Sequence, residues 1–307
     1  MNSRKCQVGF AMRSHGWKAG WIFLLVCAGC IPSSKILPPE ASTGLESPTD
    51  VQSVESSTSI SILAWNVESG GSDPQVIAQQ LKELGSDDIV CLSEVDPNNF
   101  ELFRSAKGPS FSAINGRTGR SDSLQILYDS QKFEALQTEV LETYRDYTLN
   151  NGTHRSPLYV RLSIKGTNKQ IVVMVNHLAR GNAELRKMQA IGLREWARDQ
   201  DAPLVSIGDF NMDFDFRTER GNDAFPEMIR DSIWTWVRPK ELVDTNWADR
   251  GKDGVDDYPD SMLDFAFVAG PAKTWTPECV VVVRPSDFPD DDKTSDHRPI
   301  RLTLKPR

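Results

Sequence analysis

Cysteine is scarce in this 307-residue chain, and its placement excludes a fold stapled by several disulfides. Three of the five cysteines, Cys6, Cys27 and Cys30, fall within the first thirty residues. The remaining two, Cys91 and Cys279, are far apart and lack the spacing of a metal site. Both lie in apolar, strand-like runs. This favours two separate buried thiols over the single disulfide that an oxidising compartment would allow.

Positive charge and long apolar runs are also in short supply. The chain has 35 Lys and Arg against 43 Asp and Glu, a formal net charge of −8. Such a surface does not attract nucleic acid by its own field, so a phosphate-bearing substrate needs a metal ion or a local basic patch. The apolar run at 21–29 is shorter than the roughly 20 residues of a membrane-spanning helix. No repeat of solenoid length is present.

The first thirty residues have the composition of an export signal. Four basic residues precede the short apolar run, and small residues then lead into Ala28-Gly29-Cys30. This end resembles the lipobox of bacterial lipoproteins, with Cys27 where leucine is usual. We therefore expect a leader at 1–30 that directs the protein to the cell envelope or outside the cell. Lipidated Cys30 would anchor it to a membrane; an uncleaved anchor or ordinary secretion are the alternatives.

A polar segment separates this leader from the folded part of the chain. Residues 31–58 contain PSSK, PPEAST, ESPTD and VESSTS, a composition rich in Ser, Pro, Thr and Glu with no apolar period. We interpret it as a disordered tether. The folded domain is predicted to span 59–307.

The domain begins with a strand, a helix and a second strand. Residues 60–67 and 88–95 have the continuous apolar pattern of buried strands. Between them Asp73-Pro74 predicts a helix start, Ile77 and Leu81 follow at helical spacing, and Gly85 predicts the helix end.

Further strands and one more helix are predicted downstream. The residues of 182–200 alternate as in an amphipathic helix, with Leu185, Met188, Ile191 and Trp196 predicted to face inward. The strand candidates are QILYD, SPLYVRLSI, QIVVMVNHL, PLVSIGDFN, SMLDFAFVA, CVVVVR and HRPIRLTL. About ten strands with few helices predict an α/β fold of two packed sheets flanked by helices.

Polar residues recur where these apolar strands end. They are Asn66, Glu94, Asn176, His177, Asp209, Asn211, Asp264, Asp296 and His297. Ligands gather at one edge of such sheets, so we expect these side chains to converge on one site. Asp264 lies between Leu263 and Phe265, and a buried charge needs a partner. We predict that this partner is His297.

The set of motifs resembles the endonuclease/exonuclease/phosphatase superfamily. The matching elements, in chain order, are WNV, LSEV, RSPL, NHL, GDFN, LDF and SDHRP, and they cover residues 60–305. GDFN together with SDHRP is the specific part of the signal. The resemblance implies a four-layer α/β/β/α sandwich that hydrolyses phosphate esters with a divalent cation, usually Mg²⁺, with Mn²⁺ or Ca²⁺ as alternatives.

The resemblance also implies roles for particular residues. Glu94 would hold the metal with Asn66 beside it, and Asp296 would complete the metal or water site, because Mg²⁺ prefers hard oxygen ligands. Arg155 matches an arginine that contacts phosphate, for which its forked guanidinium is suited. Glu68 departs from the pattern, since many members carry Asp there.

The remaining motif residues would carry out the chemistry. Asp209 would orient or deprotonate the attacking water, and Asn211 would donate to a phosphate oxygen. His297, held by Asp264, would polarise the phosphate or move a proton, as suits an imidazole. His177 would contact the phosphate and assist the leaving group.

Two classes of function follow. The first is an exported, monomeric hydrolase acting on nucleic acid or on small or lipid phosphates. The second is a catalytically inactive surface lipoprotein that binds a phosphate-bearing ligand; loss of Glu94, Asp209 or His297 would mark it, and all three are present. A purely structural protein is disfavoured by the same completeness.

Overall fold

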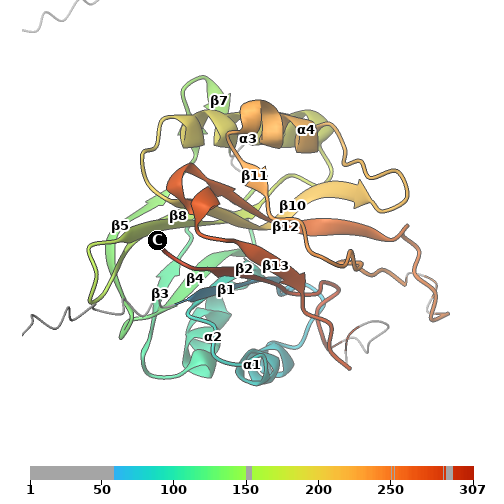
Figure 1. Cartoon of the computed structure of the whole chain (residues 1–307). Coiled ribbons are helices and arrows are strands. Elements are labelled where there is room, and N and C mark those ends of the chain that lie inside the picture. Colours follow the sequence, from blue (N-terminus) through green and yellow to red (C-terminus); the bar gives the residue numbers. More distant parts are fainter. Residues whose placement is uncertain (1–58, 150–153, 250, 252, 286, 288–292) are drawn as a thin grey trace, which may run out of the picture. The chain divides into compact units, whose positions relative to one another are not determined.

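The structure, a computed structural model, describes most of the chain downstream of the tether (Figure 1). The residues described are 59–149, 154–249, 251, 253–285, 287 and 293–307. All of them belong to one unit of the chain, Val54–Arg307. The predicted leader, the lipidation site and the tether lie outside the described residues. In the described part, no helix is long and apolar enough to cross a membrane.

The described elements alternate between strands and helices before a strand-rich C-terminal half. In chain order they are β1 (Ile60–Asn66), α1 (Pro74–Glu83), β2 (Ile89–Val95), η1 (Pro97–Asn99), α2 (Phe100–Lys107), β3 (Phe111–Asn115), β4 (Ser123–Asp129), β5 (Phe133–Val140), β6 (Thr143–Tyr144), β7 (Tyr147–Thr148), β8 (Leu158–Ile164), β9 (Gln170–His177), α3 (Ala183–Arg198), β10 (Leu204–Asp215), α4 (Ala224–Ile229), η2 (Arg230–Ser232), β11 (Thr235–Trp236), β12 (Ser261–Ala269), η3 (Gly270–Thr274), β13 (Glu278–Val281) and β14 (Ile300–Leu304).

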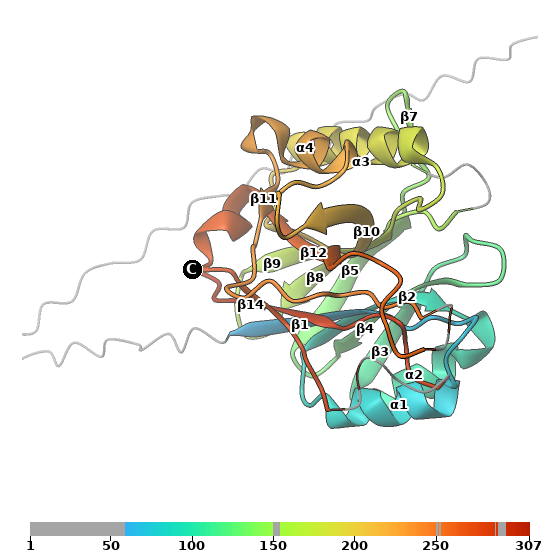
Figure 2. The same ribbon diagram turned by 90° about the vertical axis from the view of Figure 1, so that its right-hand side faces the viewer.

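Two six-stranded sheets account for most of these strands. Their orders are β13-β14-β1-β2-β4-β3 and β11-β12-β10-β9-β8-β5. The sheets are mixed: β1 and β2 pair in parallel, as do β9 and β10, while their outer neighbours pair antiparallel. Helices α1 and α2 cover the outer face of the first sheet, and α3 and α4 cover that of the second (Figures 1 and 2). The predicted α/β/β/α sandwich is confirmed.

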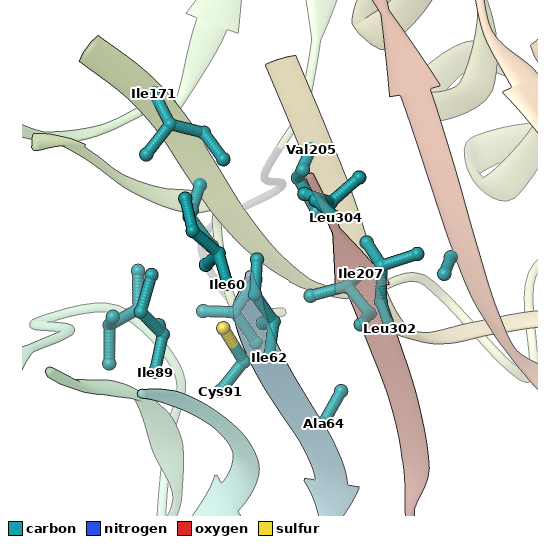
Figure 3. Packing of buried hydrophobic residues seen from close by; sticks show 14 of the residues in the cluster. Ile60, Ile62, Ala64, Ile89, Cys91, Ile171, Val205, Ile207, Leu302 and Leu304 are labelled. Atoms are coloured by element: carbon teal, nitrogen blue, oxygen red, sulfur yellow. The ribbon is translucent and has the colours of Figure 1, made fainter. Parts of the chain in front are cut away.

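The central strands β1 and β2 of the first sheet are buried on both faces, which explains their unbroken apolar runs. In β1, Ile62 and Ala64 point into the core between the sheets, whereas Leu63 and Trp65 pack under α1 and α2. Figure 3 shows the inter-sheet core, where β1 and β14 meet residues such as Ile207 of the second sheet. Because side chains alternate between the two faces of a strand, this period of two determines which residues of each strand can face the site.

Helix α1 matches its sequence signals. The Asp73 side chain accepts a backbone N–H of the first turn, and Pro74 occupies the first helical position. Ile77 and Leu81 are buried against the sheet. Gly85 follows with a φ of +93°, a conformation that favours glycine.

Helix α3 buries a different face from the one predicted. Of the four residues expected to point inward, only Trp196 is buried, and Met188 is 38% exposed. The buried face includes Gln189, whose Oε1 accepts the Ala179 N–H at 2.9 Å and whose Nε2 donates to the Leu149 carbonyl at 2.9 Å. The backbone groups of neighbouring loops therefore determine the rotation of this helix.

Both downstream cysteines are free, buried thiols in the inter-sheet core. Burial raises the pKa of the Cys279 thiol to about 12 and that of the Cys91 thiol further. These thiols are packing residues, as favoured from the sequence.

Candidate active site

The polar ends of four central strands meet at one edge of the sandwich. Asn66 ends β1, Glu94 lies near the end of β2, His177 ends β9 and Asp209 lies in β10. The two parallel pairs bring these carboxyl ends together: Asp209 is opposite His177 in β10 and β9, and opposite Asp264 in β12. The convergence predicted from the strand-end residues is present.

Irregular backbone directs two of these side chains. Glu94 has a φ of +53° and Asn211 a φ of +51°. The strand pairing shifts at both places, between Leu92 and Val95 and between Asp209 and Phe214. Such bulges re-aim side chains and are common beside functional sites.

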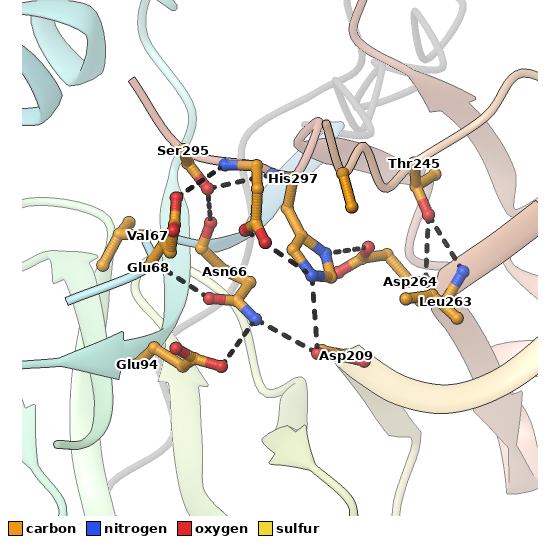
Figure 4. A network of polar contacts seen from close by, with 12 residues as sticks. Asn66, Val67, Glu68, Glu94, Asp209, Thr245, Leu263, Asp264, Ser295 and His297 are labelled. Atoms are coloured by element: carbon orange, nitrogen blue, oxygen red, sulfur yellow. Dashed lines mark hydrogen bonds and ion pairs between the residues drawn. The ribbon is translucent and has the colours of Figure 1, made fainter. Parts of the chain in front are cut away.

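Asn66 links the two sheets through its side-chain amide (Figure 4). Its Nδ2 donates to Glu94 Oε1 at 3.2 Å and to Asp209 Oδ2 at 3.1 Å. Its Oδ1 accepts the backbone N–H of Glu68 at 3.1 Å. An uncharged side chain thus holds one carboxylate from each sheet in place without neutralising either.

Asp264 and His297 form the contact predicted from the sequence. His297 Nδ1 lies 2.8 Å from Asp264 Oδ2, and its Nε2 lies 3.9 Å from both Asp209 Oδ2 and Asp296 Oδ1. Burial lowers the pKa of His297, but the carboxylates, led by Asp264, outweigh it and hold this pKa well above its ordinary value. The neighbouring carboxylates therefore favour the protonated form of this imidazole.

Backbone contacts fix this pair from both sides. Thr245, fully buried, accepts the Asp264 backbone N–H with its Oγ1 at 3.3 Å. Ser295 Oγ accepts the His297 backbone N–H at 3.0 Å, and Trp65 Nε1 donates to the His297 carbonyl at 2.8 Å. Neither Thr245 nor Ser295 was assigned a role from the sequence, although Ser295 begins the motif SDHRP.

His177 faces two carboxylates, and its surroundings favour the neutral imidazole. Its Nε2 lies 3.4 Å from Asp209 Oδ2 and 3.6 Å from Glu94 Oε1. Burial, with the positive charge of Arg155 second, holds the pKa of His177 well below its ordinary value. Its Nδ1 has no hydrogen-bond partner within the described residues. Donor atoms of Glu94, His177 and Asp209 all lie within 4.8 Å of one another, a spacing that suits a metal ion.

The predicted metal ligands overlap this cluster only at Glu94. Asn66 contacts the cluster as a hydrogen-bond donor, and Asp296 Oδ1 lies 3.9 Å from His297 Nε2, the ring nitrogen that also faces Asp209. Burial raises the pKa of Asp296 above its ordinary value. Glu68 accepts the Asp296 backbone N–H at 2.9 Å; burial first, then the charge of Asp296, raises the pKa of Glu68 to about 7. Glu68 therefore positions the segment that carries Asp296 and His297.

Asp209 is the most enclosed acid of the pocket. Burial raises its pKa to about 7, with Asp264 and Glu94 adding to the effect and His297 opposing it. A carboxyl group with such a pKa exchanges a proton near neutral pH, which is the property of a general base.

Asn211 is fully buried behind this group. Its Nδ2 donates to the Leu178 carbonyl at 3.0 Å, and its backbone N–H donates to Asp209 Oδ1 at 2.9 Å. An amide nitrogen carries two hydrogens, so one remains for the predicted donation to phosphate.

Two arginines lie on different sides of the pocket. Arg155 forms ion pairs with Asp122 at 2.5 Å and with Glu94 at 3.4 Å. Arg180 donates from Nη1 to Asn211 Oδ1 at 3.3 Å, and its guanidinium lies 5.1 Å from the centre of the Tyr258 ring. Arg180 was missed from the sequence, although it follows the strand-end motif NHL by two positions.

These side chains surround an open pocket of about 280 Å³. It is lined by Glu94, His177, Arg180, Asp209, Asn246, Ala248, Tyr258, Asp296 and His297. Three carboxylates, two imidazoles and one guanidinium share this lining. The three carboxylates would repel a phosphoryl group, and a bound cation would offset that repulsion.

The fold and this constellation of residues define a phosphoesterase-type site. Residues 63–297 match the sequence profile of the Endonuclease/Exonuclease/phosphatase family, so the chain belongs to that family. Protein angel of Drosophila melanogaster is 28% identical over 137 residues, which cover 40% of this chain and 39% of the relative. The chain thus matches well under half of that relative's length.

Solved structures share the fold at low sequence identity. A mannosyl-6-phosphatase of Bacteroides thetaiotaomicron VPI-5482 matches with a TM-score of 0.58 at 15% identity, over 79% of this chain and 98% of its own. TDP2 of D. rerio, solved with a single-strand DNA product, matches with a TM-score of 0.61 at 18% identity, over 80% and 98%. Family and fold together support a hydrolase of phosphate esters.

Proposed function

We propose that this protein is a divalent-metal-dependent hydrolase of phosphate esters, in which water attacks the phosphorus. The observation that carries the proposal is the cluster of Asp209, Asp264, His177 and His297, all nearly inaccessible to solvent around one pocket. Burying four titratable groups costs stability unless they are paired, and packing alone does not require them.

The donor set fits a hard divalent cation. Glu94 and Asp209 offer carboxylate oxygens, His177 offers Nε2, and the Nδ1 of His177 lacks a partner among the described residues. Carboxylate oxygens suit Mg²⁺ and Mn²⁺. We propose that Glu94 holds the cation, with Mg²⁺ as the physiological ion and Asp296 as a further carboxylate of the same pocket, while Asp209 stays free to act on water. A bound cation would offset the charge that develops on the phosphoryl oxygens.

Asp209 and His297 supply the proton chemistry in this proposal. Asp209, with a pKa of about 7, accepts a proton from the attacking water. His297, kept protonated by Asp264, donates a hydrogen bond to a phosphoryl oxygen. Asp264 is a positioning residue, since it acts through the imidazole.

The substrate phosphate would lie between the two arginines. Arg155 is held at the Glu94 side by Asp122, and Arg180 is held at the Asn211 side. Guanidinium groups match phosphate geometry with paired N–H donors. The neutral His177 would then assist the leaving group from its place beside Asp209.

The test is turnover by the full-length protein with and without metal. We would assay phosphate monoesters, diesters and DNA with Mg²⁺, Mn²⁺ or Ca²⁺, and then with EDTA. Activity should require the metal and fall about a hundredfold to ten-thousandfold in His297→Ala, as for a lost acid–base group. His154→Ala, a histidine outside the pocket lining, is the control. Folded, metal-binding protein that hydrolyses no ester would favour the ligand-binding alternative.

We also propose that the protein is exported and carries lipid on Cys30. The support is the basic, apolar and small-residue order of the leader. Labelling with palmitate in a bacterial host tests it. Label that persists in Cys30→Ser would disprove modification at this residue.

A further inference from the structure

A second hollow continues the catalytic pocket toward the end of β10. It has a volume of about 220 Å³ and shares Arg180, Asn246 and Tyr258 with the first. Asp213, Asp215 and Ser261 line the second hollow alone. The two hollows therefore adjoin along these shared residues, and we refer to them together as the groove. A ligand whose phosphate lies against His297 would extend its remaining part past Arg180.

The wall that carries Arg180 is held firmly. The buried Arg186 donates from Nη1 to the carbonyls of Ala179 at 2.7 Å and Arg180 at 2.6 Å. On the other wall, the Tyr258 backbone N–H donates to Asp256 Oδ1 at 3.0 Å. The stacking of Arg180 on Tyr258 joins the two walls, so the groove is preformed.

The charge of the groove reverses beyond Arg180. Asp213 accepts from Asn222 Nδ2 at 2.7 Å, and Asp215 accepts from the Thr218 backbone N–H at 2.6 Å. Asp213 Oδ2 also lies 4.0 Å from Arg186 Nη2, and Asp215 also interacts with Arg217. A carboxylate has about four lone-pair sites, so both retain acceptor capacity. A nucleic acid strand carries a charge about every 3.4 Å, so its next phosphates would meet these carboxylates.

We propose that this part of the groove is the leaving-group subsite and that it accepts an uncharged, hydroxyl-rich alcohol, such as a sugar or polyol bearing a single phosphate. The inference rests on the proposed hydrolase function. Asp213 and Asp215 accept hydrogen bonds from hydroxyl groups, Ser261 adds a hydroxyl, and the Tyr258 ring packs against C–H groups. The same carboxylates reject a polyanionic strand by charge repulsion.

The experiment compares substrates in the full-length protein with Mg²⁺. The substrates are glucose 6-phosphate, glycerol 3-phosphate, p-nitrophenyl phosphate and a single-stranded oligonucleotide. The test variant is Asp213→Asn with Asp215→Asn, since asparagine preserves both backbone-shaping contacts and tolerates the φ of +43° at position 213. The control is Asp146→Asn with Asp201→Asn, two exposed acids that cause the same change in net charge.

The wild type should hydrolyse a polyol phosphate with a higher kcat/KM than the oligonucleotide. In the test variant, kcat/KM for that polyol phosphate, relative to p-nitrophenyl phosphate, should fall about tenfold through KM, as expected for lost charged hydrogen bonds. Relative activity on the oligonucleotide should rise. The control should keep the wild-type ratios.

Two results would overturn the assignment of this subsite. One is a wild type that prefers the oligonucleotide, and the other is a test variant whose substrate ratios equal those of the control. In both cases hydrolysis persists, so the proposed hydrolase function survives. A wild type that turns over no substrate with metal bound would refute the function and, with it, this subsite.

Discussion

Replacing Asp264 by Asn should move the titration of His297 and slow the reaction. The carboxylate is fully buried and lies 2.8 Å from the imidazole Nδ1. Asparagine has the same shape and still offers an oxygen to Nδ1–H, but it carries no charge. The variant therefore removes the main cause of the raised pKa of His297 while preserving the packing around it.

The size of the effect follows from the interaction that is lost. A hydrogen bond to a charged group contributes about 1.5–3 kcal/mol, which corresponds to a fall of about 1–2 pH units in the pKa of His297. We expect the alkaline limb of the kcat profile to move to lower pH by the same amount, about 1–2 units, so that the loss of activity grows as pH rises.

Stability should change in the same direction, with a defined pH dependence. The folded-state pKa of His297 lies above its ordinary value of 6.5. The stabilisation from the protonated pair is therefore fully present below pH 6.5 and is lost as pH rises through the raised pKa. The gap in melting temperature between wild type and Asp264→Asn should be largest in acid and narrow in base.

The assay is the pH dependence of kcat for p-nitrophenyl phosphate, measured beside thermal melts. Asp87→Asn is the matched control, because Asp87 is equally buried and paired with Arg301 at 2.6 Å, away from the pocket lining. The control should lose stability and keep the wild-type pH profile. A folded Asp264→Asn protein with an unchanged profile would refute the argument that this carboxylate sets the protonation of His297.

Three further predictions concern the same edge of the sheets. Asp209→Asn should raise the melting temperature without metal at pH 8. The pKa of Asp209 is raised from 3.8 to about 7 in the folded protein, so the ionised carboxylate destabilises the fold above pH 7. An unchanged melting temperature would contradict the argument that burial raises this pKa. Glu94→Gln should weaken Mn²⁺ binding by at least about tenfold in calorimetry; wild-type affinity would remove Glu94 from the metal site. Gly208→Ala should lower the free energy of unfolding by about 2–4 kcal/mol in denaturant melts, since its φ is +127° and a Cβ would lie 2.4 Å from the Asn176 carbonyl oxygen. Gly166→Ala, where a Cβ would meet open space, should lower it by about 1 kcal/mol. Equal losses of unfolding free energy would show that the contact with Asn176 does not matter.

The local sequence determined the elements and the chemistry available at their ends. Continuous apolar runs predicted the buried strands, and Asp73, Pro74 and Gly85 marked the bounds of α1, because caps and burial periods act over a few residues. The pairing of Asp264 with His297 was also predictable, since a charge flanked by Leu263 and Phe265 needs a partner. The strands β3, β5, β6, β7 and β11 and the helices α2 and α4 were missed.

Only the tertiary structure decided how these residues meet. Asn66, which also bonds Glu94, donates to Asp209 across 143 positions of sequence. Ser295 Oγ donates to the Asn66 carbonyl from 229 positions away. The positive φ of Glu94 and Asn211, the inward face of α3 and the groove beside Arg180 likewise arise from contacts between distant segments. A sequence pattern records which faces are buried. The packing of two sheets determines which polar ends share a pocket, because hydrogen bonds and charges depend on distances that no local period encodes.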